Sequence, residues 1–428
     1  MQSSASEIQR DITGSGGQDG RAIHIGRLTL AACLLFWIFV FCDSGWGPVL
    51  VPLSAQIHIS LTTAGLLYVV WSTGYLPGAI VGGAMLDRFG PRHVLFGAAL
   101  IVLSGISVIF LGLFIPQFVS IWILLVIAGL AGSGGGVIDA STNGMISAVY
   151  AEKRGMALNL FNLLYPLGGV LVALIDAGLL RLFHNDPRPA FLFTICFIVG
   201  AMLSLPGIPK RYMIGHGKSK ASDDTQDAIK QAPTLLAALA PVIAVMIFTA
   251  GISSSLRAWT PAYLHVAYAQ TPVIAAALSS ITWILATLSR LGAALLIARI
   301  GSWRIVIIGI TITLIGFVTV MLSPNAILAT LALSLASIGL SPLFATCLAI
   351  GSELAGRSLG SVAGILLFAA GISTVFCGWF FGFLLNSIGP LWSIGFCFTF
   401  IVLGGLMALR LHPTRTGRVD QRSSAQSP

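Results

Sequence analysis

Twelve long apolar runs, separated by short polar segments, limit what this chain of 428 residues can fold into. The hydrocarbon layer of a bilayer is about 30 Å thick, so about 20 helical residues cross it. Backbone groups in lipid must be bonded internally, and a helix does this within one segment. We therefore predict an all-α membrane protein with twelve transmembrane helices. The spans are expected near 28–54, 61–86, 93–115, 119–149, 156–183, 190–208, 234–264, 272–297, 303–323, 326–350, 360–386 and 391–410.

Composition argues against several other classes of protein. Only 9% of the residues are charged, against about 25% in soluble proteins. The net charge of +9 is spread over short loops and tails, which is typical of a membrane topology signal and not of a nucleic-acid surface. The six cysteines lie inside apolar runs without metal-binding spacing. No catalytic triad or phosphate loop stands out, so we expect neither an enzyme nor a cofactor.

The polar segment 209–233 is the longest one inside the chain and leaves six apolar runs on either side. It lacks apolar periodicity and is predicted to be a flexible cytoplasmic linker. The expected organisation is a tail at 1–27, an N-terminal six-helix half at 28–208, the linker, a C-terminal six-helix half at 234–410 and a tail at 411–428.

The positions of the basic residues indicate how the chain is oriented. The loops after spans 2, 4, 6, 8 and 10, together with both tails, carry most of them, including Lys153, Arg154, Arg299 and Arg357. The loops after spans 1, 3, 9 and 11 carry none. Cytoplasmic loops are enriched in Lys and Arg. We therefore expect both termini to be cytoplasmic, with the protein in the plasma or inner membrane of a cell.

A short charged turn between spans 2 and 3 has the spacing Gly-x-x-x-Asp-Arg-x-Gly-x-Arg, formed by Gly83, Asp87, Arg88, Gly90 and Arg92. Gly83 allows close helix approach, and Gly90 with the following proline breaks the helix. The opposite charges of Asp87 and Arg88 can bind neighbouring helix ends. We expect this turn to act as a gating loop.

A degenerate copy of this turn follows span 8. If Gly301 is matched to the glycine at 90, Arg299 matches the arginine at 88 and Ala298 replaces the aspartate. This weak repeat suggests that the two halves echo each other. In transporters built from such repeats, the substrate site lies near the midplane between the halves.

Acidic residues inside a span cost about 2.5–3.5 kcal/mol on insertion scales, so each one needs a partner or a function. Asp43 lies in span 1, just before glycines and a proline that loosen the helix. Asp139 and Asn143 are four apart in span 4, on one helix face, and follow a run of glycines. Asn162 adds an amide in span 5. Roles in helix packing stay open for these residues, but together they predict a polar site inside the bundle.

Arg290 in span 8 is a further charge inside the membrane. A guanidinium stays charged at any working pH, so a buried one needs an anionic partner. Two roles are open: an ion pair with Asp43 or Asp139, which we favour, or a binding site for an anionic solute. In span 5, a local ion pair is expected between Asp176 and Arg181, near the outer surface.

The charged turn, in a chain of twelve spans, resembles the signature loop of the major facilitator superfamily of transporters. The span-4 run 134–143 resembles that of the fucose/hexose–proton symporter group, and the runs 283–290 and 339–346 are similar to segments of the same group. In that group an acid in span 1 and one in span 4 are the essential carboxylates. The resemblance implies that role for Asp43 and Asp139.

The favoured hypothesis is a secondary transporter that moves a small polar solute, a sugar or polyol, coupled to protons by alternating access. Burial favours the neutral form of a carboxyl group, so Asp43 and Asp139 can load a proton on one side and release it on the other. The alternatives are transport of an anionic metabolite, or efflux of a drug-like compound, using Arg290, and a receptor without transport activity. The expected partners are the solute, protons and the bilayer, with a monomer as the functional unit.

Candidate solute contacts combine amides, which suit hydroxyl groups, with indole rings, which suit the apolar face of a sugar. They are Asn143, Asn162, Trp46, Trp259 and Arg290, and Trp283 is a further candidate for stacking on a sugar face.

Overall fold

The computed structural model describes residues 25–115, 120–150, 157, 160–208, 225–355 and 359–411. Within these ranges the ordered elements are helices, and no β-strand is present. Twelve helical segments are long and apolar enough to cross a membrane. The predictions of an all-α fold and of twelve spans are therefore confirmed, and the chain is a multi-pass membrane protein.

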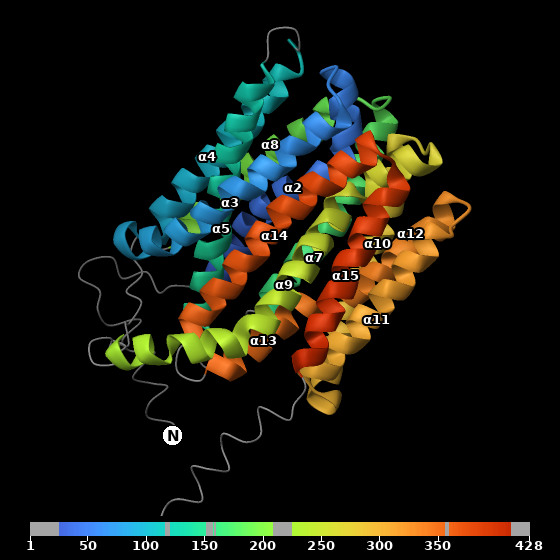
Figure 1. Ribbon diagram of the computed structural model, residues 1–428. Helices are drawn as coiled ribbons and strands as arrows, with labels where there is room; N and C mark the ends of the chain where they lie inside the picture. Colours follow the sequence, from blue (N-terminus) through green and yellow to red (C-terminus); the bar gives the residue numbers. More distant parts are fainter. Residues whose placement is uncertain are drawn as a thin grey trace, which may run out of the picture.

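The helices pack side by side in one bundle (Figure 1). The first half of the chain forms α2 (Ile25–Gln56), α3 (Leu61–Phe89), α4 (Pro91–Gly112), α5 (Ile121–Val149), α7 (Leu164–Leu182), α8 (Arg188–Met202) and the short 3-10 helix η3 (Leu205–Gly207). The second half forms α9 (Thr225–Tyr268), α10 (Pro272–Ile300), α11 (Ser302–Met321), α12 (Ala326–Leu340), α13 (Leu343–Ala355), α14 (Leu359–Ser387), α15 (Pro390–Ala408) and η4 (Leu409–Leu411).

Helix α9 begins at Thr225, inside the segment predicted to be a linker. The part of α9 that is apolar enough to span a membrane begins only at Leu239. Hydropathy therefore marks where the span begins but not where the helix begins. Residues 209–224 of the predicted linker, and the tails at 1–24 and 412–428, lie outside the described ranges.

The second helix of each half begins and ends in the same way. Both α3 and α10 contain 29 residues. Ser60 and Thr271 precede them with nearly identical backbone angles (φ −64°, ψ 151° and φ −62°, ψ 150°), and each side chain accepts from the amide three residues on. Gly90 and Gly301 end them with φ of +78° and +83°, a region that favours glycine. The repeat inferred from these two glycines is thus present in three dimensions.

The two halves contact each other mainly along four helix pairs: α2 with α9, α2 with α10, α3 with α14, and α7 with α10. Figure 1 shows α14 lying beside α3. Trp259 of α9 is fully buried where α3 and α14 meet. A methyl group added at Gly65 of α3 or at Gly382 of α14 would lie 2.2 Å from its indole ring. This indole therefore fits between the halves only because both positions lack a side chain.

The tenth span, predicted as one helix, is broken into α12 and α13 at Ser341 and Pro342. Pro342 has no N–H, so it cannot donate to the carbonyl of Ile338 one turn earlier. The hydroxyl of Ser289 in α10 donates to that carbonyl at 2.6 Å instead. Ser341 Oγ donates to the carbonyl of Ala286 in α10 at 2.8 Å. The break is thus fastened to α10, next to the residues described below.

Candidate functional site

Asp43 of α2 is half-buried and is held by two aromatic side chains. The indole Nε1 of Trp71 in α3 donates to Asp43 Oδ1 at 3.0 Å, and the hydroxyl of Tyr165 in α7 donates to Asp43 Oδ2 at 2.6 Å. Both carboxyl oxygens are therefore bonded, and the acid ties three helices together. Hydropathy does not distinguish these aromatic residues from the many others in the spans, so neither was predicted.

Asp139 of α5 is the centre of a second hydrogen-bond network. The hydroxyl of Tyr75 in α3 donates to Asp139 Oδ2. Asn143 Nδ2 donates to Asp139 Oδ1 at 2.7 Å, as the four-residue spacing predicts for residues on one face. Asn162 Nδ2 in turn donates to Asn143 Oδ1 at 2.9 Å. The structure thus brings the three predicted polar residues together and adds a tyrosine that the sequence did not indicate.

Phe39 of α2 lies between the two networks. Its ring stacks on that of Tyr75 with 5.3 Å between centroids, and on that of Tyr165 with 5.9 Å. Tyr75 is a partner of Asp139, and Tyr165 is a partner of Asp43. A movement of α2 against its neighbours therefore displaces donors of both carboxyl groups at once.

The expected ion pair between Arg290 and a core carboxylate is not formed. Arg290 Nε donates to the hydroxyl of Ser341 at 2.9 Å and to its carbonyl at 3.2 Å. Within the described part of the chain, the only ion pair joins Asp186 and Arg188, in the turn between α7 and α8. The prediction was wrong because Arg290 is bonded to two oxygens of Ser341, at the break in span 10. Hydropathy does not reveal this break.

The predicted pair of Asp176 and Arg181 is also absent from the described residues. Five residues turn an α-helix by about 500°, so these side chains point about 140° apart. Asp176 is buried, with 4% of its surface exposed, whereas Arg181 is exposed. The spacing alone therefore excludes the local contact.

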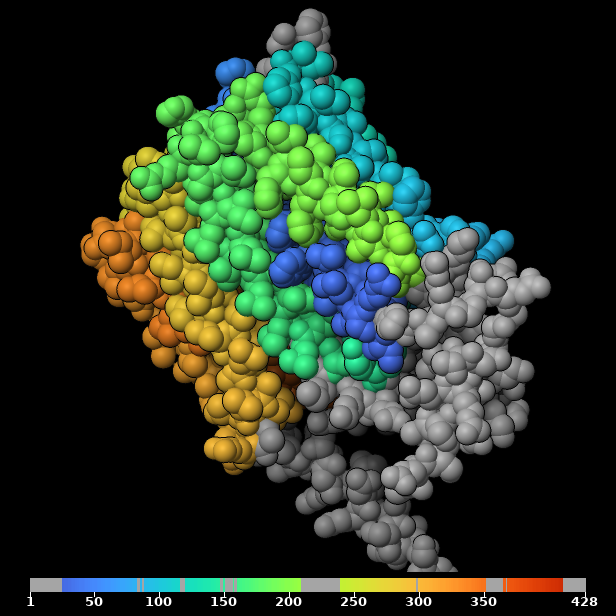
Figure 2. Space-filling model, turned by 180° about the vertical axis from the view of Figure 1, so that it is seen from behind, coloured from blue at the N-terminus to red at the C-terminus, as the bar shows by residue number. Residues whose placement is uncertain are grey.

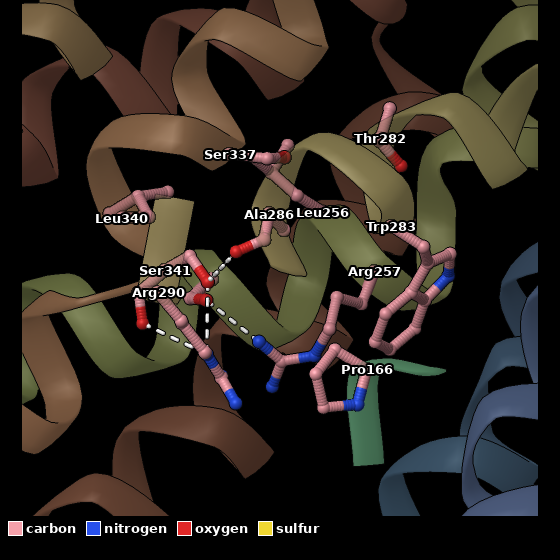
Figure 3. A pocket seen from close by; sticks show the side chains of 11 residues that line it. Pro166, Leu256, Arg257, Thr282, Trp283, Ala286, Arg290, Ser337, Leu340 and Ser341 are labelled. Atoms are coloured by element: carbon pink, nitrogen blue, oxygen red, sulfur yellow. Dashed lines mark hydrogen bonds between the residues drawn. The ribbon is translucent and has the colours of Figure 1, made fainter. Parts of the chain in front are cut away.

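A cavity lined by the C-terminal half, with Pro166 of α7 at its edge, contains two arginines. Arg257 of α9 and Arg290 of α10 both line it, and their guanidinium groups lie toward one another in Figure 3. Its remaining lining residues are either hydroxyl-bearing or apolar, and none is acidic. They are Pro166, Ser253, Leu256, Thr282, Trp283, Ala286, Ser337, Leu340 and Ser341. We call this space the arginine cavity.

Arg257 was not predicted to belong to the site. Its Nη1 donates to Ser253 Oγ at 2.7 Å, and its guanidinium lies 5.8 Å from the ring centroid of Tyr165 and 5.9 Å from that of Trp283. Guanidinium groups are attracted to aromatic faces at such distances. Since Tyr165 also binds Asp43, one aromatic ring connects the acid network of the first half with the arginine cavity.

The two tryptophans predicted to contact solute do not line the arginine cavity. Trp259 fills the glycine gap between α3 and α14, and Trp46 lines a different cavity, next to Asp176. Trp283 of α10, the further candidate for stacking, does line this cavity. Sequence proximity to polar residues does not fix which helix face an indole occupies.

The predicted gating loop lies at the junction of α3 and α4. Gly90 ends α3 and starts α4, and the exposed Arg88 places its guanidinium 5.3 Å from the ring of the next residue. Arg92 is half-buried in the first turn of α4. The side chain of Asp87 and the burial of Gly83 lie outside what the structure describes. The gating role therefore stays a prediction.

Twelve spanning helices with a repeated helix geometry, acids and amides bonded inside the first half and two arginines in the second, are typical of transporters of the two-fold repeated class. A family model described as the Major Facilitator Superfamily matches residues 32–376. The chain therefore belongs to the major facilitator superfamily.

Three curated relatives match parts of the chain. Myo-inositol transporter 1 of Candida albicans is 26% identical over 51% of this chain and 42% of its own length. The hexuronate transporter of Bacillus subtilis is 26% identical over 44% of this chain and 40% of its own length. Sodium-dependent glucose transporter 1A of Mus musculus is 25% identical over 30% of this chain and 29% of its own length. The aligned stretches span less than half of each of these relatives. Their names describe transporters and not enzymes.

Solved structures share the fold over almost the whole chain. The inward open xylose transporter XylE from E. coli superposes with a TM-score of 0.75 at 16% identity and covers 94% of this chain and 99% of its own. The E. coli fucose:proton symporter FucP superposes with a TM-score of 0.60 at 14% identity and covers 92% of this chain and 100% of its own. At these identities the similarity concerns the fold. The resemblance to sugar–proton symporters predicted from the motifs is confirmed at that level.

Proposed function

We propose that the protein is a proton-coupled transporter of a small organic anion that carries hydroxyl groups, such as a sugar acid. The observation that supports this choice is the arginine cavity, in which Arg257 and Arg290 face shared space without an acidic lining residue. The neutral-sugar hypothesis required Arg290 to be neutralised by a core carboxylate. That ion pair is absent from the described residues, so the anionic alternative is now the better one.

Electrostatics favours an anionic guest in this cavity. Charges removed from water are costly unless they are paired and hydrogen-bonded. Arg290 has two oxygen partners from Ser341, and Arg257 has one from Ser253 and two aromatic faces, and all these direct partners are neutral. Asp43 acts on Arg257 electrostatically without forming an ion pair with it. A carboxylate between the two guanidinium groups adds the second negative charge that two arginines need. Arginine suits it because its planar donors match a carboxylate bidentately.

The rest of the cavity indicates the kind of organic group that accompanies the carboxylate. Trp283 offers a flat apolar face, and Leu256 and Leu340 add aliphatic walls. Thr282 and Ser337 add hydroxyl groups that can exchange hydrogen bonds with a polar solute. Such a mixed lining suits a sugar-like ring better than a purely apolar acid. The names of the inositol, hexuronate and glucose transporter relatives support a polyhydroxylated solute.

Proton coupling is proposed for Asp43 and Asp139. Asp43 is connected to the arginine cavity through Tyr165, which binds its carboxyl group and lies against Arg257. An anion bound at Arg257 offsets the positive charge near Asp43 and so favours the protonated acid. Linkage then requires that protonation of Asp43 strengthens anion binding. This reciprocity is what a symporter of an anion and a proton needs.

The remaining parts of the proposal concern topology. The distribution of basic residues supports cytoplasmic termini, with the gating loop on the cytoplasmic side. The contacts of Trp259 with Gly65 and Gly382 then lie toward the outer ends of the helices. The division into two halves around the linker, and a functional monomer, are retained on the same grounds.

Uptake by proteoliposomes tests this function. We expect an inwardly directed proton gradient to drive accumulation of labelled glucuronate, and unlabelled glucuronate, but not glucose, to compete. A matched control is Arg181→Gln, which removes an exposed arginine from α7 and should leave uptake unchanged. Arg290→Gln should abolish accumulation at the same solute concentration. Efficient competition by glucose and unimpaired uptake in Arg290→Gln would contradict the proposal.

A further inference from the structure

A second cavity, separate from the arginine cavity and partly open to the outside of the protein, is lined by Asp176 of α7. Only 4% of Asp176 is exposed, and no hydrogen bond or ion pair to its carboxyl group is present among the described residues. The cavity lies between α2, α7 and α8, with one residue of α4 at its edge. Figure 2 shows the face of the molecule on which α2, in blue, is flanked by the green α7 and α8.

The lining of this cavity is mainly apolar. Phe41, Ile106 and Phe191 contribute apolar side chains. Besides Asp176, Trp46 and Thr194 contribute polar groups. Trp46 is 3% exposed, and its indole Nε1 is buried without a hydrogen-bond partner. Two polar side chains without a hydrogen-bond partner, one acid and one N–H donor, thus line the same partly open space. Buried polar groups are normally bonded, so this arrangement can accept a small ligand.

The chemistry of the lining decides which ligand fits. Hard metal cations take six or more oxygen ligands in protein sites. Here the side chains supply the carboxyl group of Asp176 and the hydroxyl of Thr194, which already donates to the carbonyl of Ala190 at 3.0 Å. The indole N–H of Trp46 is a donor and repels a cation. A proton needs only the carboxyl group, and a water molecule can bridge that group to the indole.

We propose that Asp176 is a proton-binding site of the N-terminal half, distinct from Asp43 and Asp139, which loads and releases its proton through the cavity between α2, α7 and α8. The carboxyl group is neutral while the cavity is dry. It ionises when water enters, because water can then bridge its oxygens to the free indole N–H of Trp46. Both α2 and α7 contact helices of the C-terminal half, so the movement of that half in alternating access changes their packing and opens or closes this path.

The charged and titratable groups on the surrounding helices do not offer another partner. On α2, Cys42 lines the same cavity, Asp43 is bonded to Trp71 and Tyr165, and Arg27 and Cys33 lie nearer the start of the helix. On α7 the exposed Arg181 lies on another face, and on α8 Arg188 is paired with Asp186 and Cys196 is exposed. On α10 Arg290 is bonded to Ser341 and Arg299 lies in the last turn, and on α4 Arg92 and His93 lie at the far end. None of these groups neutralises Asp176.

Infrared difference spectroscopy of the purified full-length protein tests the proposal without any solute. A protonated carboxyl group gives a C=O stretching band apart from those of amides and carboxylates. We expect Asp176→Asn to lose one such band relative to the wild type. The control Asp186→Asn, which removes an ion-paired carboxylate in the adjoining turn, should lose none. Identical bands in wild type and Asp176→Asn would overturn the proposal.

Transport stoichiometry supplies a second, independent readout. Asp176→Asn should lower the number of protons carried per solute by about one while keeping solute exchange down a gradient. If Asp176→Asn does not fold, Asp176→Glu should retain the band at a shifted position. An unshifted band in that variant, or an unchanged proton stoichiometry in Asp176→Asn, would contradict the assignment. The infrared result does not depend on whether the solute is an anion, so it separates this inference from the proposed function.

Discussion

The packing of Trp259 predicts that a single methyl group can shift the conformational equilibrium of the transporter. A Cβ at Gly65 would lie 2.2 Å and 2.4 Å from two atoms of the indole ring, far inside van der Waals contact. Trp259 is 1% exposed and packs against both α3 and α14. Gly65 lies in the N-terminal half and Trp259 in the C-terminal half, so separating the halves at this point relieves the clash.

The size of the effect follows from overpacking. Inserting a methyl group into a packed contact costs about 1–3 kcal/mol. Because the clash exists only where the halves are closed around Trp259, Gly65→Ala should destabilise this conformation relative to the opposite one by that amount. A difference of about 1.4 kcal/mol is tenfold in population, so the ratio of the two conformations should change by about 5- to 150-fold.

Spin-label distances between the ends of α3 and α14 provide the assay. We expect Gly65→Ala to increase the fraction of molecules in which these ends are separated. Gly178→Ala in α7 and Gly200→Ala in α8 are matched controls, because a Cβ there meets nothing within 4 Å. The same distance distribution in Gly65→Ala as in these controls would refute the reasoning.

Three further predictions concern other parts of the molecule. Asp139→Asn should retain solute counterflow in proteoliposomes but lose accumulation driven by a pH gradient; full accumulation would remove Asp139 from the coupling mechanism. Ser289→Ala should lower the free energy of unfolding by about 1 kcal/mol, because it leaves the carbonyl of Ile338 without its hydrogen-bond donor. An unchanged melting temperature would show that another group bonds this carbonyl. The guanidinium of Arg188 lowers the pKa of Asp186, so this pair adds stability above the ordinary pKa of an aspartate and loses it as the pH falls through the lowered value. The stability difference between wild type and Asp186→Asn, measured by thermal melting, should accordingly be present at neutral pH and vanish in acid, and a difference independent of pH would contradict this.

The twelve spans could be predicted because each satisfies its backbone internally and needs only a long apolar run. The break in span 10 was missed for the same reason, since Ser341 and Pro342 do not lower the hydropathy of the run enough to divide it. The proline itself was a usable signal, because it removes one helical hydrogen bond. The start of α9 was missed because a helix can continue beyond the bilayer, where hydropathy carries no information.

Within the candidate site, contacts along one helix were predictable and contacts between helices were not. Asp139 and Asn143 bond to each other because their spacing fixes a common face. The partners of Arg290 depend on how α10 packs against the break in span 10, which no spacing reveals. Tyr75 and Tyr165 were not singled out, because an aromatic residue in a span is most often lipid-facing or interfacial. Only the packing of the helices shows that their hydroxyl groups donate to the two acids.

The central claim is that two arginines bind the carboxylate of a solute, and ligand-induced thermal stabilisation of the purified protein tests it most directly. Glucuronate should raise the melting temperature of the wild type, while glucose at equal concentration should not. Removing one charge-assisted contact costs about 1.5–3 kcal/mol. Arg257→Gln and Arg290→Gln should therefore each weaken glucuronate binding by about 10- to 150-fold, and Arg181→Gln should not. Equal stabilisation by glucose and glucuronate, unaffected by Arg290→Gln, would contradict the account.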